Sequence, residues 1–307
     1  KETVINSATF LAIENPSTDV ARYRAGDLDM TSYALPPEQF AKLQKELPGE
    51  VFTTRTLATY SYELNNKKAP FDNVNVRKAL NLSLDRNVIT DKVLGQGQTP
   101  TYVFTPTYIE EGHLIQQPAY SKEPMAQRNE EAIKLLEEAG YSKANPLKFT
   151  ILYNTNENHK KVAIAAASMW KANTKGLIDV KLENQEWKTY IDSRRAGRYD
   201  AARAGWNADY NQATTFGNYF LSNSSNNTAK YANPEYDKAI AESYVATDAE
   251  GRAKAYAKAE EILAKDFGIV PIFNYVNPRL VKPYVKGYSG KDPQDHIYLR
   301  NLYIIKH

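Results

Sequence analysis

Arg203, Trp206 and Asp209 lie within seven residues, and together their side chains could bind a small charged ligand. A guanidinium forms bidentate contacts with a carboxylate, a carboxylate attracts an ammonium group, and an indole face stabilises a cation. The preceding run, residues 199–204, is compatible with a β-strand, and Gly205 then permits a turn or the close approach of another backbone. The sequence therefore predicts a strand that gives way to a loop at the edge of a cavity.

Each of these charges also has a plain structural explanation. Arg203 needs an anion because burying an unpaired guanidinium is costly, and that anion could be Asp200, Asp209 or a ligand carboxylate. Asp209 could cap a turn, or it could hold an α-ammonium group beside the ring of Trp206. The residues alone leave both pairs of alternatives open.

Three further side chains are candidates. Trp187 stands where a strand passes into a helix, so it could line a pocket or pack. His159 opens a helix, where it could be an ordinary surface residue or a neighbour of a carboxylate. Trp170 lies on an alanine-rich helix and is predicted to belong to the core.

Composition excludes several classes of function. The net charge is only +3 and charges alternate along the chain, which argues against nucleic acid or a membrane surface as the main partner. The absence of cysteine excludes disulfides, thiolate catalysis and cysteine-bound metals. None of the four histidines stands at metal-ligand spacing from another, so neither a metal nor a cofactor is expected.

Motifs for catalysis are missing from the sequence. It contains no Gly-x-Ser-x-Gly, His-Glu-x-x-His, phosphate-loop or dinucleotide fingerprint. A pair of carboxylates of the glycosidase type stays open, because the spacing of such a pair is set in space and not along the chain. A hydrolase acting on peptides or glycans is therefore the alternative from a different class.

The predicted elements indicate an α/β layer architecture in one large domain or two ordinary ones. Strands are expected at residues 4–10, 53–64, 147–153, 178–183, 199–204, 269–276 and 298–305. Helices are expected at 18–25, 39–46, 72–96 with a break at 85–87, 129–140, 159–174, 186–195, from Pro234, and from Asp248 to Lys265. The order strand, helix, strand, helix, strand over residues 147–204 implies parallel pairing, and ligands bind beyond the carboxyl ends of such strands.

Several segments together resemble one known family. They are Arg22–Met30, Phe71–Arg86, Asn129–Tyr141, Gln185–Trp187, Arg203–Tyr210 and Val276–Val281. In this order they resemble the periplasmic oligopeptide-binding proteins of ABC importers, which form the peptide and nickel class, or family 5, of the extracellular solute-binding proteins. The resemblance implies a periplasmic-binding-protein-like type II two-lobed α/β fold. Residues 1–60 would be part of the first lobe, 61–276 the second, C-terminal lobe, and 277–307 a return to the first lobe.

Roles for single residues follow from this resemblance. Asp209 matches the aspartate that holds the α-ammonium group of a bound peptide, and Gly205, Trp206 and Asn207 match the backbone that pairs with it. The other matched positions are Arg203, Arg194 and His159 near carboxylates or pockets, Trp187 as a pocket wall, and Tyr275 as a cleft tyrosine near the hinge. Close relatives can carry cysteines at Ala58 and Asn207, so a staple between strands is absent here.

The implied function is that of a non-enzymatic receptor. It would capture short peptides by their termini and backbone and deliver them to the permease subunits of an ABC transporter. The resemblance implies a periplasmic location in a Gram-negative bacterium after export by a signal peptide outside these residues. It also implies a monomer at full length, with the missing N-terminal part of the same lobe pair as a partner. A muropeptide receptor of the same fold, with a pocket for a γ-linked diacid, is the close alternative.

Overall fold

The computed structural model describes residues 4–13, 15–32 and 34–306, and it has the α/β architecture that the sequence predicts. The chain divides into two compact units. The first unit comprises Lys1–Thr56, Thr90–Gln98 and Tyr275–His307, and the second unit comprises Leu57–Ile89 and Thr99–Asn274. Two long strands, β1 (Val51–Leu64) and β6 (Ile269–Leu280), each contribute residues to both units.

The remaining strands are β2 (Thr99–Pro100), β3 (Leu147–Asn154), β4 (Ile178–Gln185), β5 (Ala201–Asn207), β7 (Val285–Lys286) and β8 (Tyr303–Ile304). The α-helices are α1 (Pro16–Ala25), α2 (Pro37–Glu46), α3 (Val74–Leu82), α4 (Met125–Glu138), α5 (Glu157–Asn173), α6 (Trp187–Arg195), α7 (Thr214–Gly217), α8 (Pro234–Val245) and α9 (Ala249–Lys265). Shorter turns are the π-helix η1 (Val88–Leu94) and the 3-10 helices η2 (Ala119–Lys122), η3 (Asn218–Phe220) and η4 (Leu299–Asn301).

The main sheet has six strands in the order β2-β6-β1-β5-β3-β4. β3 pairs in parallel with both β4 and β5, which confirms the parallel arrangement predicted for this part of the sequence. β5 in turn pairs antiparallel with β1, so the sheet is mixed. β5 therefore lies between a parallel neighbour and an antiparallel one, with its carboxyl end at Asn207.

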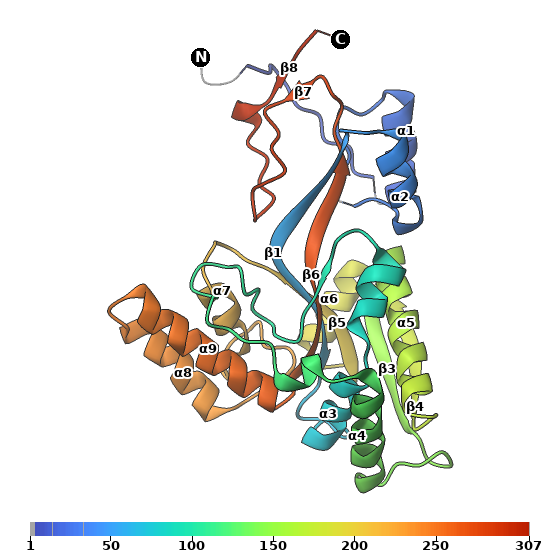
Figure 1. The fold of residues 1–307 in the computed structure, drawn as a ribbon, viewed down its shortest axis with the longest axis vertical. Coiled ribbons are helices and arrows are strands. Elements are labelled where there is room, and N and C mark those ends of the chain that lie inside the picture. Colours follow the sequence, from blue (N-terminus) through green and yellow to red (C-terminus); the bar gives the residue numbers. More distant parts are fainter. Residues whose placement is uncertain (1–3, 14, 33, 307) are drawn as a thin grey trace. The chain divides into compact units, whose positions relative to one another are not determined.

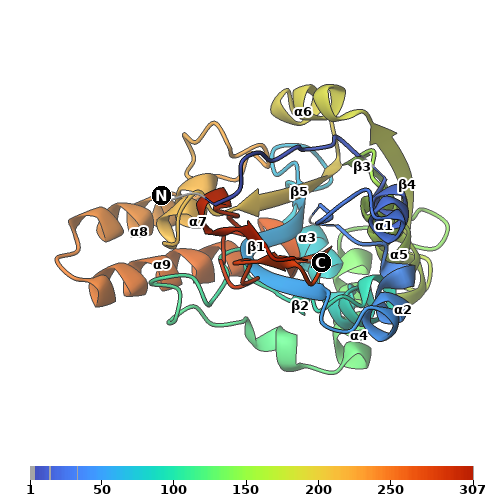
Figure 2. The same ribbon diagram turned by 90° about the horizontal axis from the view of Figure 1, so that it is seen from above.

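Helices cover both faces of this sheet in the second unit, as Figures 1 and 2 show for α5 and α6. Trp170 of α5 packs against Phe149 of β3, with ring centroids 5.7 Å apart. Tyr190 of α6 packs in a buried cluster with Leu152 of the same strand. Because successive residues of a strand point to opposite faces, Phe149 and Leu152 assign α5 and α6 to opposite sides of the sheet.

Trp170 is fully buried, which confirms its prediction as a core residue. Its indole nitrogen donates a hydrogen bond to the carbonyl of Leu80 at 2.9 Å, so the one polar atom of the side chain is satisfied in the core.

A second core holds α7, η3, α8 and α9 together. In its aromatic centre, the ring of Phe104 contacts the rings of Phe216 and Phe220 edge-on. α8 begins at Pro234 after the N-cap Asn233, and α9 begins after the N-cap Asp248, both as the sequence predicts. In Figure 1 these two helices run side by side as a hairpin.

The first unit has its own small core, in which α1 and α2 pack Val20, Tyr23 and Leu43 against Leu280 of β6. α1 begins at Pro16 with Asn15 as N-cap and ends at Gly26, whose positive φ of 87° closes the helix. α2 is likewise close to its prediction.

Four local predictions are wrong. Residues 4–10 form no strand. Within the described residues no strand pairs with them, and β propensity without a pairing partner does not produce a strand. The strand predicted at 298–305 is reduced to Tyr303–Ile304 after the turn η4. The helix predicted from Asn129 begins a turn earlier, after Pro124. The segment 97–124, for which no strand or helix is predicted, contains β2 and η2.

Candidate functional site

The backbone of β5 sets the geometry of the candidate site. Gly205 does not turn the chain: β5 continues through it to Asn207, with Gly205 opposite Tyr60 and Asn207 opposite Ala58. Arg203 and Trp206 are three residues apart in a continuous strand, so their side chains point to opposite faces of the sheet. The expectation that arginine, tryptophan and aspartate form one cluster is therefore wrong, because the strand does not end at the glycine.

Arg203 lies on the face covered by α5. Its guanidinium stands 5.2 Å from the ring centroid of Tyr60, and its Nη1 lies 3.4 Å from Oδ1 of Asn154. The ring of His159 is 5.5 Å from the same tyrosine ring. The structure thus brings together two of the predicted residues, Arg203 and His159, around an aromatic ring that the sequence analysis did not single out.

The electrostatics of this face favour an uncharged imidazole. Burial and then the nearby charge of Arg203 lower the pKa of His159 well below its ordinary value. At neutral pH the Arg203 guanidinium is therefore the cationic group of this pair, and His159 can donate or accept one hydrogen bond through each ring nitrogen.

Trp206 and Asp209 lie at the carboxyl end of β5, where a third side chain links them. The hydroxyl oxygen of Thr215 in α7 is 3.2 Å from Nε1 of Trp206 and 3.2 Å from the backbone nitrogen of Asp209. The same oxygen lies 3.3 Å from Oδ2 of Asp209. Trp206 is half-buried and Asp209 is exposed, so an indole and a solvent-facing carboxylate are held near one point.

Arg194 forms a buried network behind the site. Its Nη2 lies 3.1 Å from both carboxylate oxygens of Glu63, and it also donates to Tyr219 and Thr228. Burial is the largest single influence on the pKa of Arg194 and would lower it. The charge of Glu63, the neighbouring tyrosines and the hydrogen bond to Glu63 together outweigh burial and hold this pKa well above its ordinary value. The charge of Arg194 is thus compensated inside the chain, and a direct contact of this residue with a ligand stays a prediction.

Two tyrosines, one through its ring and one through its hydroxyl, connect this region to β5. The ring of Tyr219, whose hydroxyl donates to Glu63 at 2.6 Å, lies 4.9 Å from the ring of Trp206. Tyr190 donates its hydroxyl proton to the carbonyl of Arg203, and burial raises the pKa of Tyr190 to about 12, so this hydroxyl stays protonated at neutral pH. The network therefore supports the strand that bears the candidate residues.

The other predicted residues are more dispersed. Trp187 is the first residue of α6, is 54% exposed, and stacks on Tyr190 at 6.0 Å. Asn207 is exposed at the last position of β5. Tyr275 belongs to the first unit, where its carbonyl accepts a hydrogen bond from the hydroxyl of Thr56. The other eight predicted residues all belong to the second unit.

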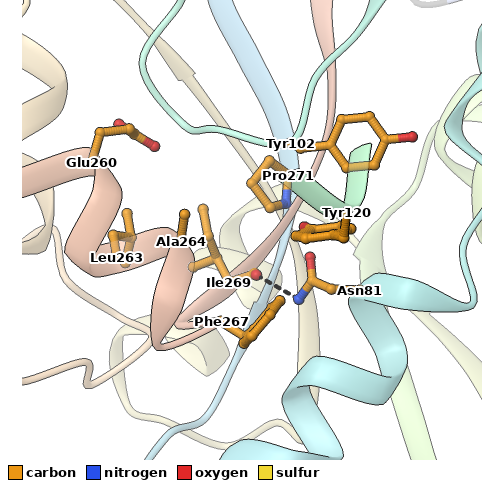
Figure 3. A pocket seen from close by; sticks show the side chains of 9 residues that line it. All are labelled: Asn81, Tyr102, Tyr120, Glu260, Leu263, Ala264, Phe267, Ile269 and Pro271. Atoms are coloured by element: carbon orange, nitrogen blue, oxygen red, sulfur yellow. Dashed lines mark hydrogen bonds between the residues drawn. The ribbon is translucent and has the colours of Figure 1, made fainter. Parts of the chain in front are cut away.

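A small pocket also occurs in the second unit, away from β5 (Figure 3). Its lining residues are Asn81, Tyr102, Tyr120, Glu260, Leu263, Ala264, Phe267, Ile269 and Pro271. Glu260 accepts hydrogen bonds from the backbone amides of Phe104 and Thr105, and burial raises its pKa although these bonds oppose the change. This carboxylate ties α9 to Phe104 and Thr105, which follow β2, and this is a structural role.

The part of the chain that the structure describes contains no group of three or more histidine, aspartate or glutamate side chains placed to hold a metal ion. In the same residues, no helix has both the length and the apolar character that crossing a membrane requires.

The comparison with known families decides the class of protein. Residues 1–228 match the family described as bacterial extracellular solute-binding proteins, family 5 Middle. The chain belongs to this family.

Individual family 5 proteins are also similar along the whole chain. It is 96% identical over 307 residues to the periplasmic oligopeptide-binding protein OppA of Haemophilus influenzae, and it covers 57% of that protein. It is 54% identical to OppA of Salmonella typhimurium and 44% identical to the periplasmic murein peptide-binding protein MppA of Escherichia coli. The chain thus spans a little over half the length of these curated relatives.

Solved structures of family 5 proteins match the fold. The crystal structure of H. influenzae OppA in complex with RPPGFSPFR superposes with a TM-score of 0.95 at 95% identity, covering 99% of this chain and 60% of that one. The E. coli murein tripeptide-binding protein MppA gives 0.93 at 44% identity and covers 100% and 59%. The α/β fold of the type II two-lobed class, predicted from the sequence, is confirmed for the portion that this chain spans.

Sequence reasoning missed the side chains that hold the candidate residues in place. Thr215, Tyr60 and Glu63 contact the predicted residues but carry no motif of their own. Tyr60 and Glu63 could have been found from the period-2 pattern of β1 once its pairing with β5 was known. Nothing in the sequence around Thr215 indicates that its hydroxyl faces Trp206.

Proposed function

We propose that this chain is part of the substrate-binding component of an ABC transporter, which captures short oligopeptides in the periplasm and delivers them to the permease for import. The observation that carries the proposal is the superposition on H. influenzae OppA in complex with RPPGFSPFR, at a TM-score of 0.95 and 95% identity. The proposed receptor binds and releases its ligand without chemical conversion. In line with this, the relatives are named as binding proteins.

The geometry at the end of β5 suits the amino terminus of a peptide. An ammonium group is attracted by a carboxylate, and it gains further from the face of an indole ring. Asp209 offers an exposed carboxylate, and the ring of Trp206 is held near it because both side chains form hydrogen bonds with the hydroxyl of Thr215. We therefore assign Asp209 to the peptide α-ammonium group, with Gly205, Trp206 and Asn207 as the backbone that a peptide would pair with.

The opposite face of β5 suits a carboxylate. Arg203, Tyr60 and His159 combine one cation, one aromatic ring and one neutral hydrogen-bonding ring. In our proposal Arg203 and His159 meet acidic groups of the ligand, and Trp187 forms an exposed aromatic wall. Tyr275 and Arg194 would be further ligand contacts. We further propose that the second unit corresponds to the C-terminal lobe and the first unit to part of the other lobe.

A muropeptide receptor is the second candidate, because E. coli MppA superposes with a TM-score of 0.93. Its identity to this chain is 44%, against 96% for H. influenzae OppA, and this difference favours general oligopeptides. A peptide or glycan hydrolase has no comparable support.

Two measurements on a receptor of the relatives' full length that contains these 307 residues test the proposal. Native mass spectrometry of purified protein should show co-purified peptides, whereas protein that emerges without peptide and cleaves peptides on addition would overturn the proposal. The second measurement compares peptides with free and acetylated amino termini. Asp209→Asn should weaken binding of the free form about 10- to 100-fold, because a charge-assisted hydrogen bond is lost, and change the acetylated form little.

A further inference from the structure

Thr215 uses the full hydrogen-bonding capacity of its hydroxyl at the candidate site. A threonine hydroxyl has one proton to donate and two lone pairs to accept. The oxygen accepts from the indole N–H of Trp206 at 3.2 Å and from the backbone N–H of Asp209 at 3.2 Å. Its own proton goes to Oδ2 of Asp209 at 3.3 Å. One hydroxyl therefore fixes an aromatic side chain, a backbone amide and a carboxylate.

The short helix that presents Thr215 is held firmly by its surroundings. The hydroxyl of Tyr236 in α8 donates to the carbonyl of Gly217 at 2.7 Å, and a Cβ at Gly217 would come within 2.7 Å of Cδ1 of Ile240. Thr214 and Tyr256 of α9 share a hydrogen bond of 2.8 Å between their hydroxyls. α7 is thus anchored to α8 and α9, and Thr215, which is only 5% exposed, cannot move independently of them.

The group that this hydroxyl orients would otherwise be mobile. Asp209 is exposed, and within the described residues Thr215 is the one side chain that donates a hydrogen bond to its carboxylate. An unrestrained carboxylate loses rotamer freedom when it binds a ligand, and this loss reduces affinity. A carboxylate already oriented by a fixed donor avoids most of that cost.

We propose that Thr215 is a positioning residue for the α-ammonium site: its hydroxyl orients the Asp209 carboxylate and the Trp206 ring together, so that both meet the same amino terminus. This inference rests on the proposed function, since it takes the ligand to be a peptide with a free amino terminus. Thr215 does not itself touch the ligand in this scheme. Its effect reaches the ligand through the two residues that it holds.

Matched variants separate this role from a general effect on stability. Thr215→Val replaces the hydroxyl with a methyl group of similar size, and Thr215→Ser keeps the hydroxyl. Thr214→Val removes the neighbouring hydroxyl of the same helix, which bonds to Gln212 and Tyr256 and not to Trp206 or Asp209. The probes are one tripeptide with a free amino terminus and the same tripeptide acetylated, titrated into the full-length receptor by calorimetry.

Thr215→Val is expected to weaken the free tripeptide about tenfold relative to the acetylated one, as loss of an oriented hydrogen-bond partner implies. Thr215→Ser should restore most of the discrimination, and Thr214→Val should keep the wild-type ratio. An unchanged ratio in Thr215→Val would overturn the inference. Should this variant not fold, as judged by circular dichroism, the comparison of Thr215→Ala with Thr215→Ser decides by the same ratio.

A second measurement does not depend on any ligand. With ¹⁵N-labelled indoles, the Trp206 N–H resonance should move upfield and exchange faster with solvent in Thr215→Val but not in Thr214→Val. An indole resonance that is the same in the wild type and in Thr215→Val would show that the hydrogen bond from Trp206 to Thr215 is not formed in solution.

Asp209→Asn keeps the two hypotheses distinguishable. If Asp209→Asn abolishes the preference for a free amino terminus and Thr215→Val does not affect it, the positioning role alone is wrong. If neither variant affects it, the assignment of the α-ammonium site under the proposed function is wrong as well.

Discussion

Arg203 and Asp209 are close in sequence but meet different environments. The guanidinium of Arg203 lies between the ring of Tyr60 and Asn154 on the α5 face of the sheet. The carboxylate of Asp209 faces solvent beyond the end of β5. A ligand carboxylate at Arg203 would therefore lose more of its water than a ligand ammonium group at Asp209. Because charges attract more strongly in a less solvated place, each contact with Arg203 should contribute more binding free energy.

His159 provides a prediction on the pH dependence of stability. Its pKa is lowered in the folded state, by burial first and by the charge of Arg203 second, whereas in the unfolded chain it is about 6.5. Between these values the unfolded chain binds more protons, so the free energy of unfolding decreases as the pH falls below about 6.5. His159→Asn should lose less stability between pH 7.5 and pH 5 than the wild type does, measured by urea unfolding.

Arg203→Met is the informative companion to this variant. Because burial is the larger cause of the lowered pKa, removing the arginine charge should reduce the pH dependence only in part. Identical pH profiles for the wild type and His159→Asn would show that the imidazole does not titrate as the structure implies.

At the residue level, the sequence indicated chemistry better than it indicated partners. The types and spacing of Arg203, Trp206 and Asp209 singled them out as candidates, and their role in binding stays a prediction. Trp170 was correctly assigned to the core. The contacts of Glu63 and Thr215 could not be predicted. Glu63 meets Arg194 across 131 residues of sequence, and Thr215 lies in the four-residue helix α7, which is too short to show a periodic pattern.

Among the secondary-structure elements, the Glu63–Arg194 pair joins β1 to α6, with Tyr219 of η3 as a third member. The side chain of Glu63 is 1% exposed and that of Arg194 is 10% exposed. Breaking a buried pair on one side leaves an uncompensated charge in a poorly solvated place. The network should therefore control how firmly these elements are held behind Trp206.

Glu63→Gln should lower the free energy of unfolding by about 3–5 kcal/mol, because Arg194 then keeps its charge without an anion. The double variant Glu63→Leu with Arg194→Met should recover much of this loss. Urea unfolding followed by tryptophan fluorescence measures both. As a control, Glu242→Gln breaks the exposed pair with Lys258 and should cost under about 1 kcal/mol. Equal losses for the buried and exposed pairs would contradict the expectation.

Elements with local signals were the ones predicted well. The N-caps Asn233 and Asp248 mark α8 and α9, because a capping side chain satisfies backbone groups within its own turn. Residues 4–10 and 298–305 have strand-like composition but mostly lack strand partners in the described chain. Strand formation depends on pairing with distant residues, and propensity carries no information about that pairing.

For the molecule as a whole, the important contacts link distant parts of the sequence. β1 and β5 pair over seven residues, from Ala58 opposite Asn207 to Leu64 opposite Ala201. This register could not be derived from the sequence by periodicity, since β5 also has a parallel neighbour in β3. The resemblance drawn from the sequence implied only that the positions of Ala58 and Asn207 are close to each other, and it did not give the register.

A disulfide introduced at those positions tests the register and its effect on stability. Ala58 and Asn207 are directly opposite in the antiparallel pair, where Cβ atoms approach closely enough for a disulfide. Ala58→Cys with Asn207→Cys should oxidise readily and raise the free energy of unfolding by about 3–5 kcal/mol, because the bond closes a long loop in the unfolded chain. Comparing urea unfolding with and without reductant isolates this contribution from the effect of the substitutions themselves.

The pair Ala58→Cys with Ala208→Cys is the matched control. Ala208, just beyond β5, continues the register through its amide bond to the carbonyl of Leu57, so its Cβ lies on the opposite face of the sheet from that of Asn207. This control should stay largely reduced under the same conditions and gain no stability from oxidation. Equal oxidation of both pairs would mean that the two strands slide past each other or that the register is different. The register of β5 determines where Trp206 lies and where the chain continues to Asp209. A different register would therefore also remove the geometric basis of the α-ammonium site.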